Sequence, residues 1–125
     1  TNKKNKIYKK LGGIKMTDAL DLEDLEMVAM ALIGHAGESK SLAYQALYAA
    51  KAGNFDEAAK LMEESSEEML KSHEIQTSLI VKEASGEKLE TGLIMVHAQD
   101  HLMSAILFKD IVKEFIELYK TVKGC

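Results

Sequence analysis

The stretch LIMVHAQDHLMSAILF, residues 93–108, decides the architecture of this chain. It is apolar around its whole circumference, because at about 100° per residue Met95 and Leu102 point away from the side that carries Leu93. A helix that is apolar on all sides is buried on all sides, and two neighbouring helices cannot cover it. We therefore predict that other copies of the chain supply the remaining cover, with this helix central in a closed, symmetric homo-oligomer.

Two further long helices are predicted before this stretch. Apolar or small residues recur at three- and four-residue spacing from Leu22 to about Ala52, and again from Phe55 to Ala84. The intervening Gly53-Asn54 pair is typical of a tight turn. The third helix is expected to run from about Glu90 to Val122, and no segment alternates as a strand would. The sequence thus predicts an all-α fold, an antiparallel three-helix bundle in a single domain over residues 17–125.

Two glycines interrupt the first predicted helix, in the run ALIGHAGESKS. Gly34 and Gly37 each cost about 1 kcal/mol relative to alanine in a helix interior. Close approach of another helix, or a ligand near the backbone, would explain why glycine stands at both positions.

Charge is distributed unevenly along the chain. All 16 cationic residues are lysines, and six of them lie in the first 16 residues, which contain no acidic residue. Residues 17–125 hold the other ten lysines against 20 acidic residues, a formal charge of −10, so this body is a poor candidate for binding nucleic acid. We expect residues 1–16 to form a basic, disordered tail.

Cysteine usage and hydropathy indicate a cytoplasmic location. The single cysteine, Cys125, allows no internal disulfide and no cysteine-rich zinc site, which fits a reducing compartment. The basic tail lacks the apolar core of a signal peptide, so export is not expected. No apolar run reaches the roughly 18 residues that span a membrane, because Asp100 interrupts the longest one, and we expect no direct membrane insertion.

Three polar residues stand in the middle of the apolar stretch. His97, Asp100 and His101 lie at positions i, i+3 and i+4, so they share one face of the third predicted helix. An unpaired buried carboxylate is costly, so their presence needs a reason. Two interpretations stay open from the residues alone. One is a hydrogen-bonded histidine layer that fixes the register of the helices, and the other is a reactive site.

The spacing of the histidines excludes two kinds of metalloenzyme. The zinc hydrolase motif H-E-x-x-H places a glutamate after the first histidine, and Ala98 stands at that position. Di-iron bundles use Glu-x-x-His pairs, and no histidine of this chain has a glutamate three residues before it. The sequence also contains no Gly-rich phosphate loop and no serine elbow.

A histidine acting as nucleophile survives these exclusions. A neutral imidazole has a free lone pair that can accept a phosphoryl group and pass it on. Phosphoryl transfer depends mainly on positioning and on donors to the phosphoryl oxygens. The candidate donors in this sequence are Gln99, His101, Gln76 and His73.

Four blocks of the sequence resemble the lactose/cellobiose-type enzyme IIA component of the bacterial phosphoenolpyruvate-dependent sugar phosphotransferase system. They are ALIGHAGESKSLAYQAL, AKAGNFDEAAKLMEES, HEIQTSLIVKEASG and VHAQDHLM, and the similarity covers about residues 22–121. The resemblance implies a three-helix bundle assembled as a homotrimer with the third helices central. His97 matches the histidine that is phosphorylated on Nε2. Asp100 matches the aspartate that, one from each subunit, holds a magnesium-type cation on the threefold axis.

The resemblance also implies partners. A protein of this family accepts phosphoryl from the phosphocarrier HPr and passes it to a cysteine of enzyme IIB, which phosphorylates a disaccharide during uptake through the membrane component IIC. The sugar is left open among lactose, cellobiose, chitobiose and related glycosides. Val81 stands where glutamine is expected and Lys40 where arginine is usual. The alternative to a phosphoryl-relay protein is a non-catalytic helical interaction or regulatory module that kept the fold. The intact HAQDH motif favours the phosphoryl-relay protein.

Overall fold

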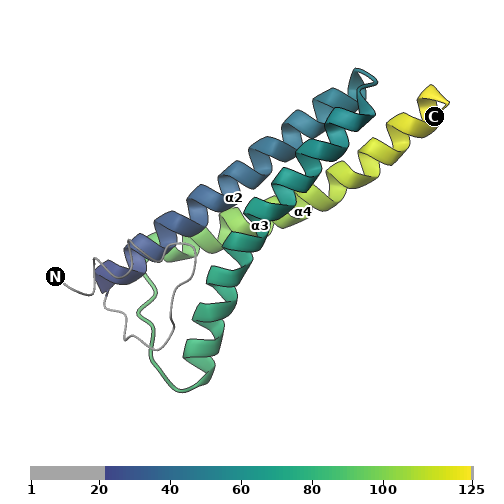
Figure 1. The fold of residues 1–125 in the computed structure, drawn as a ribbon. Helices are drawn as coiled ribbons and strands as arrows, with labels where there is room; N and C mark the ends of the chain where they lie inside the picture. Colours follow the sequence, from purple (N-terminus) through teal and green to yellow (C-terminus); the bar gives the residue numbers. More distant parts are fainter. Residues whose placement is uncertain (1–21, 125) are drawn as a thin grey trace.

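Three long helices make up the part of the chain that the structure describes (Figure 1). The computed structural model describes residues 22–124, with side chains from residue 24 onward. The helices are α2 (Leu22–Lys51), α3 (Phe55–Ala84) and α4 (Leu93–Lys123), and residues 22–124 contain no strand. The predicted all-α class and the antiparallel three-helix bundle are confirmed. The basic tail predicted for residues 1–16 lies outside the described residues.

A tight turn joins α2 to α3 at the predicted place. Gly53 takes φ +87°, a left-handed conformation that side chains other than glycine rarely adopt. The backbone N–H of Asn54 donates to the carbonyl of Ala49 at 2.8 Å, which closes the end of α2. Because the turn is this short, α2 and α3 run antiparallel and side by side (Figure 1).

The link between α3 and α4 is longer. It spans residues 85–92 and is joined to the end of α3 by an ion pair of 2.9 Å between the buried Lys82 and Glu87. Helix α4 begins at Leu93, after the extended Gly92 (ψ 171°), and not at the predicted Glu90. In Figure 1 the last turns of α3 diverge from α2 and α4 on the way to this link.

Helix α2 packs closely against both other helices because its contact face consists mainly of small residues. The buried alanines of this face are Ala29, Ala36, Ala43, Ala46 and Ala50. Between α2 and α3, the Ser39 hydroxyl donates to the Ser65 carbonyl at 2.8 Å, and the Ser65 hydroxyl donates to the Ser39 carbonyl at 2.7 Å. These reciprocal bonds satisfy buried hydroxyl groups and fix the register of the two helices.

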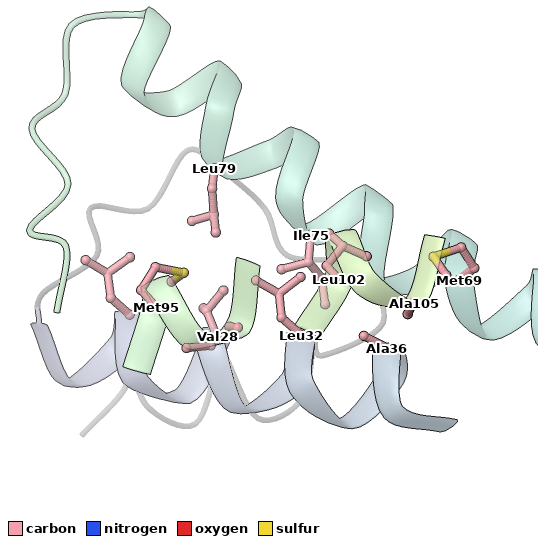
Figure 2. Packing of buried hydrophobic residues seen from close by; sticks show 12 residues of the cluster. Val28, Leu32, Ala36, Met69, Ile75, Leu79, Met95, Leu102 and Ala105 are labelled. Carbon is pink, nitrogen blue, oxygen red and sulfur yellow. The ribbon is translucent and has the colours of Figure 1, made fainter. Parts of the chain in front are cut away.

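Larger side chains from all three helices fill the space beside the polar stretch of α4 (Figure 2). Leu32 and Leu102 are fully buried at its centre, and Ile75 of α3 packs against them. A second cluster, around Val112 and Ile116, continues the core toward the C-terminal end of α4. The inward face of α4 is thereby anchored along most of its length.

None of the residues that the structure describes covers the outward face of α4. The exposed apolar side chains of this face recur at intervals of three, four or seven residues; they are Leu93, Val96, Met103, Leu107, Ile111, Phe115, Leu118 and Val122. We call these eight residues the outer face of α4. The expectation that two neighbouring helices cannot cover this helix is therefore confirmed for the single chain. None of the helices in residues 22–124 is both long and apolar enough to cross a membrane.

The two glycines of α2 do not mark a contact between the helices that the structure describes. Gly34 and Gly37 are exposed, and a Cβ atom added at either position would meet nothing within 4 Å. No other helix of residues 22–124 approaches these glycines, because α2 turns its face of Leu32 and Ala36 toward α3 and α4, and approach by a helix of another copy stays a prediction. A ligand near these glycines stays untested.

Candidate functional site

The register of α4 brings His97 and Asp100 to the surface. Ala98 and Leu102 are fully buried, so the residues on the opposite side of the helix face outward. His97 and Asp100 are exposed, and His101 is partly buried at the edge of the bundle. A nucleophile at this position is within reach of a partner protein.

The two histidines of α4 contact each other directly. Their Nε2 atoms lie 3.0 Å apart, and the rings meet edge to face with centroids 4.4 Å apart. One Nε2 must therefore carry a proton and donate it to the lone pair of the other. When His101 is the donor, His97 carries its own proton on Nδ1 and presents a lone pair at Nε2. The contact thus accommodates the tautomer of His97 that a nucleophilic Nε2 requires.

Asp100 lies on the same side of α4 as the outer face, between Val96 and Met103 in sequence. No hydrogen bond or ion pair joins its carboxylate to any residue that the structure describes. Among those residues, no group of three or more His, Cys, Asp or Glu side chains is arranged to hold a metal ion. A metal site at Asp100 would therefore need ligands from other copies of the chain.

The two glutamines named as candidate donors contact each other and not His97. The Gln76 Nε2 donates to the Gln99 Oε1 at 2.7 Å, and the Gln99 amide also contacts the Met95 sulfur at 3.6 Å. Two residues along a helix correspond to about 200°, so Gln99 faces α3 while His97 faces outward. Within one chain the structure brings His97 and His101 together and places Gln76 and Gln99 in a separate pair.

His73 lies apart from both pairs. It is exposed on α3 and borders a shallow hollow of about 300 Å³ that Met69, Leu70 and Ile106 also line. The hollow is apolar, and its other walls carry no ionisable side chain. His73 as a donor to a phosphoryl group stays a prediction.

The fourth histidine belongs to a contact between α2 and α3. The His35 Nδ1–H donates to the Glu68 carboxylate at 2.8 Å, and Lys71 binds the other oxygen at 2.9 Å. The hydrogen bond from His35, supported by Lys71, holds the pKa of the Glu68 carboxyl below its usual value. The sequence reasoning missed this network, although the i, i+3 spacing of Glu68 and Lys71 was a visible part of it.

Comparison with known proteins places these observations in a family. Residues 27–120 match the family described as "PTS system, Lactose/Cellobiose specific IIA subunit". The lichenan-specific phosphotransferase enzyme IIA component of Bacillus subtilis is 47% identical over 100 residues, which are 80% of this chain and 91% of that protein.

Solved structures agree with this match. The crystal structure of the cellobiose-specific enzyme IIA from Bacillus anthracis has a TM-score of 0.78 and 39% identity, covering 85% of this chain and 95% of that one. The IIA(Chitobiose) chain solved in solution as a complex with HPr, from the N,N'-diacetylchitobiose branch of Escherichia coli, has a TM-score of 0.69 and 38% identity. That alignment covers 84% of this chain and 99% of the other.

Proposed function

Because the chain belongs to the lactose/cellobiose-specific IIA family of the phosphotransferase system, we propose that it relays phosphoryl groups through His97. The observation that carries the proposal is the exposed His97 side chain, whose Nε2 lies 3.0 Å from the Nε2 of His101. When His101 donates in this contact, the lone pair of His97 is on Nε2, and opening the contact would free it to attack phosphorus. The His97 side chain is exposed, so a phosphorylated partner could dock against it.

The relay consists of two phosphoryl transfers, one to His97 and one from it. In the first, a P–N bond forms at His97 Nε2 as the bond between phosphorus and the donor protein breaks. In the second, the P–N bond breaks as a thiolate of the acceptor takes the phosphoryl group, and the lone pair returns to His97. Little covalent chemistry is left for the protein to do, so catalysis depends on positioning and on donors to the phosphoryl oxygens.

His101 is the donor nearest to the reacting nitrogen. Once His97 Nε2 carries phosphorus, the N–H of His101 loses its acceptor and is free to turn to a phosphoryl oxygen. A charge-assisted hydrogen bond of this kind is stronger than the one it replaces. Gln76, Gln99 and His73 would contribute only from a neighbouring copy or after rearrangement, because none of them contacts His97 in the single chain.

The outer face of α4 supports a homotrimer with the third helices central. Its eight exposed apolar side chains form a stripe along the helix, and Asp100 interrupts that stripe. In such a trimer three Asp100 carboxylates would converge on the axis. At an effective dielectric of about 20, two like charges about 4 Å apart repel by roughly 4 kcal/mol.

A divalent cation shared by three Asp100 carboxylates would offset this repulsion. Asp100 fits such a role because its carboxylate is exposed and makes no contact within the described chain. Oxygen ligands from carboxylates, completed by water, suit Mg²⁺. The cation would supply positive charge at the centre of the assembly.

The partners of the relay follow from the family. We propose that the donor is the phosphocarrier HPr, with which a 38% identical chain was solved as a complex. The acceptor would be a cysteine of enzyme IIB, which serves the membrane component IIC in disaccharide uptake, and the relay would take place in the cytoplasm. Relatives are named for lichenan, cellobiose, lactose and diacetylchitobiose, so the sugar belongs to this class of glycosides.

Phosphorylation in a reconstituted system tests the proposal. The chain is incubated with phosphoenolpyruvate, enzyme I and HPr, and its intact mass is measured. We expect one acid-labile phosphoryl group per chain, none on His97→Ala, and normal uptake by the matched His35→Ala variant, since His35 lies in a different contact. Equal labelling of His97→Ala and the unmodified chain would refute the relay, and an unlabelled parent would favour a non-catalytic module.

A further inference from the structure

The contact between His97 and His101 offers a second kind of chemistry. We propose that the two Nε2 atoms form a bidentate binding site for a late first-row transition-metal ion, Cu²⁺, Ni²⁺ or Zn²⁺. The site uses nitrogen ligands from a single chain. It therefore differs from the cation proposed at Asp100, which would need oxygen ligands from three chains.

The distance between the nitrogens fits chelation. Zinc binds imidazole nitrogen at about 2.0–2.1 Å, so two such ligands lie about 2.8–3.4 Å apart for angles at the metal between 90° and the tetrahedral value. The observed separation of 3.0 Å falls within this range, near the value for the right angle that Cu²⁺ and Ni²⁺ favour. Rotation of the two rings about their side-chain bonds would bring both lone pairs onto one ion.

The backbone already holds the two rings in place. His97 and His101 stand one turn apart in the interior of a helix of 31 residues, so binding requires no ordering of the main chain. Ala98 and Leu102, each next to one of the histidines, are fully buried and anchor this turn to the core. A ligand pair that is ordered before binding loses little conformational entropy when the ion arrives.

The surroundings leave room for an ion and its remaining ligands. His97 is exposed and His101 partly buried, so water can complete the coordination shell. No third His, Cys, Asp or Glu side chain of residues 24–124 joins the pair in a metal-binding arrangement. A site with two protein ligands and open positions exchanges its ion readily, unlike a closed structural site with four.

Occupation of this site and phosphorylation exclude each other. The ion and the phosphoryl group need the same lone pair, that of His97 Nε2. This half of the inference rests on the proposed function, whereas binding of the ion does not. A transition-metal ion is therefore expected to act as a reversible inhibitor of phosphoryl acceptance.

Calorimetric titration tests binding without reference to activity. The full chain carrying Cys125→Ser, which removes its only thiol, is titrated with CuCl₂, NiCl₂, ZnCl₂ and MgCl₂. We expect one ion per chain, Cu²⁺ bound more tightly than Ni²⁺ or Zn²⁺, and no binding of Mg²⁺ that depends on the histidines.

Single substitutions locate the ion. Loss of an outer-shell partner already costs about 10- to 100-fold in metal affinity. Replacing one of the two ligands, in His97→Ala or His101→Ala, is therefore expected to weaken binding at least about tenfold. His73→Ala is the matched control, because it removes an exposed histidine that contacts neither ring. Affinities of His97→Ala and His101→Ala equal to that of the control would overturn the site.

A second experiment distinguishes failure of the metal site from failure of the phosphoryl relay. Zn²⁺ should block phosphoryl uptake by the Cys125→Ser chain, while the residual uptake of His101→Ala should be far less sensitive to the ion. Equal sensitivity of the two chains would overturn the competition. A parent that binds Zn²⁺ at the histidines but never takes up phosphoryl would refute the relay and support the metal site.

Discussion

The homotrimer can be tested through Leu107, a member of the outer face of α4. In the single chain this side chain is 62% exposed, although it is a leucine in the middle of a long helix. Complete burial of a leucine contributes about 1.5–3 kcal/mol, so burying the exposed part would contribute roughly 1–2 kcal/mol per chain. Leu107→Ala should remove up to about 3–6 kcal/mol per trimer, or about 10²- to 10⁴-fold in the dissociation constant.

A matched control distinguishes this effect from a general loss of apolar surface. Met30 on α2 is 55% exposed and does not belong to the outer face of α4, so Met30→Ala should leave the assembly unchanged. Sedimentation of both variants over a range of concentrations measures the trimer fraction, and circular dichroism checks that the helices remain. The reasoning would be refuted if Leu107→Ala dissociated no more readily than Met30→Ala, or if the parent chain sedimented as a monomer.

Three further predictions address individual side chains. A chelator should lower the thermal midpoint of the parent trimer, and Asp100→Asn should abolish this effect without dissociating the trimer. An Asp100→Asn protein that is still sensitive to the chelator would contradict the shared cation. The depressed pKa of Glu68 contributes stability above pH 4.5, the ordinary value, which is lost as the pH falls through the lower folded value. Glu68→Gln should therefore weaken the fall of the thermal midpoint at acid pH, and an unchanged pH dependence would show that the Glu68 carboxyl does not contribute to it. His101→Ala should slow phosphoryl uptake about 10²- to 10³-fold in rapid-quench assays without abolishing it; a fully inactive His101→Ala beside an active His97→Ala would exchange the two roles.

The sequence was sufficient to predict the helices because their signals are local. Apolar spacing placed α3 at Phe55–Ala84, as observed, and placed the end of α2 within one residue. The start of α4 was predicted three residues early, since Gly92 is extended and ends the link before the helix begins. Apolar residues all round α4 also indicated that one chain could not cover it.

Contacts between helices could not be predicted in the same way. The pairing of Gln76 with Gln99, and of His35 with Glu68, depends on how far one helix is shifted along another. No local periodicity determines that shift; it is set by packing, including the reciprocal bonds of Ser39 and Ser65. The i, i+4 contact of the two histidines on α4 was predictable, because a single helix determines it.

The most direct test of the account is to identify the nitrogen that carries the phosphoryl group. The chain is labelled with ¹⁵N in its histidine rings, phosphorylated through HPr, and examined by NMR spectroscopy of the imidazole nitrogens. The account predicts that phosphorus is bonded to Nε2 of His97 alone, and that the ring resonances of His101 shift as its hydrogen bond changes acceptor. Phosphorus on Nδ1 of His97, or on any nitrogen of His101, would contradict it.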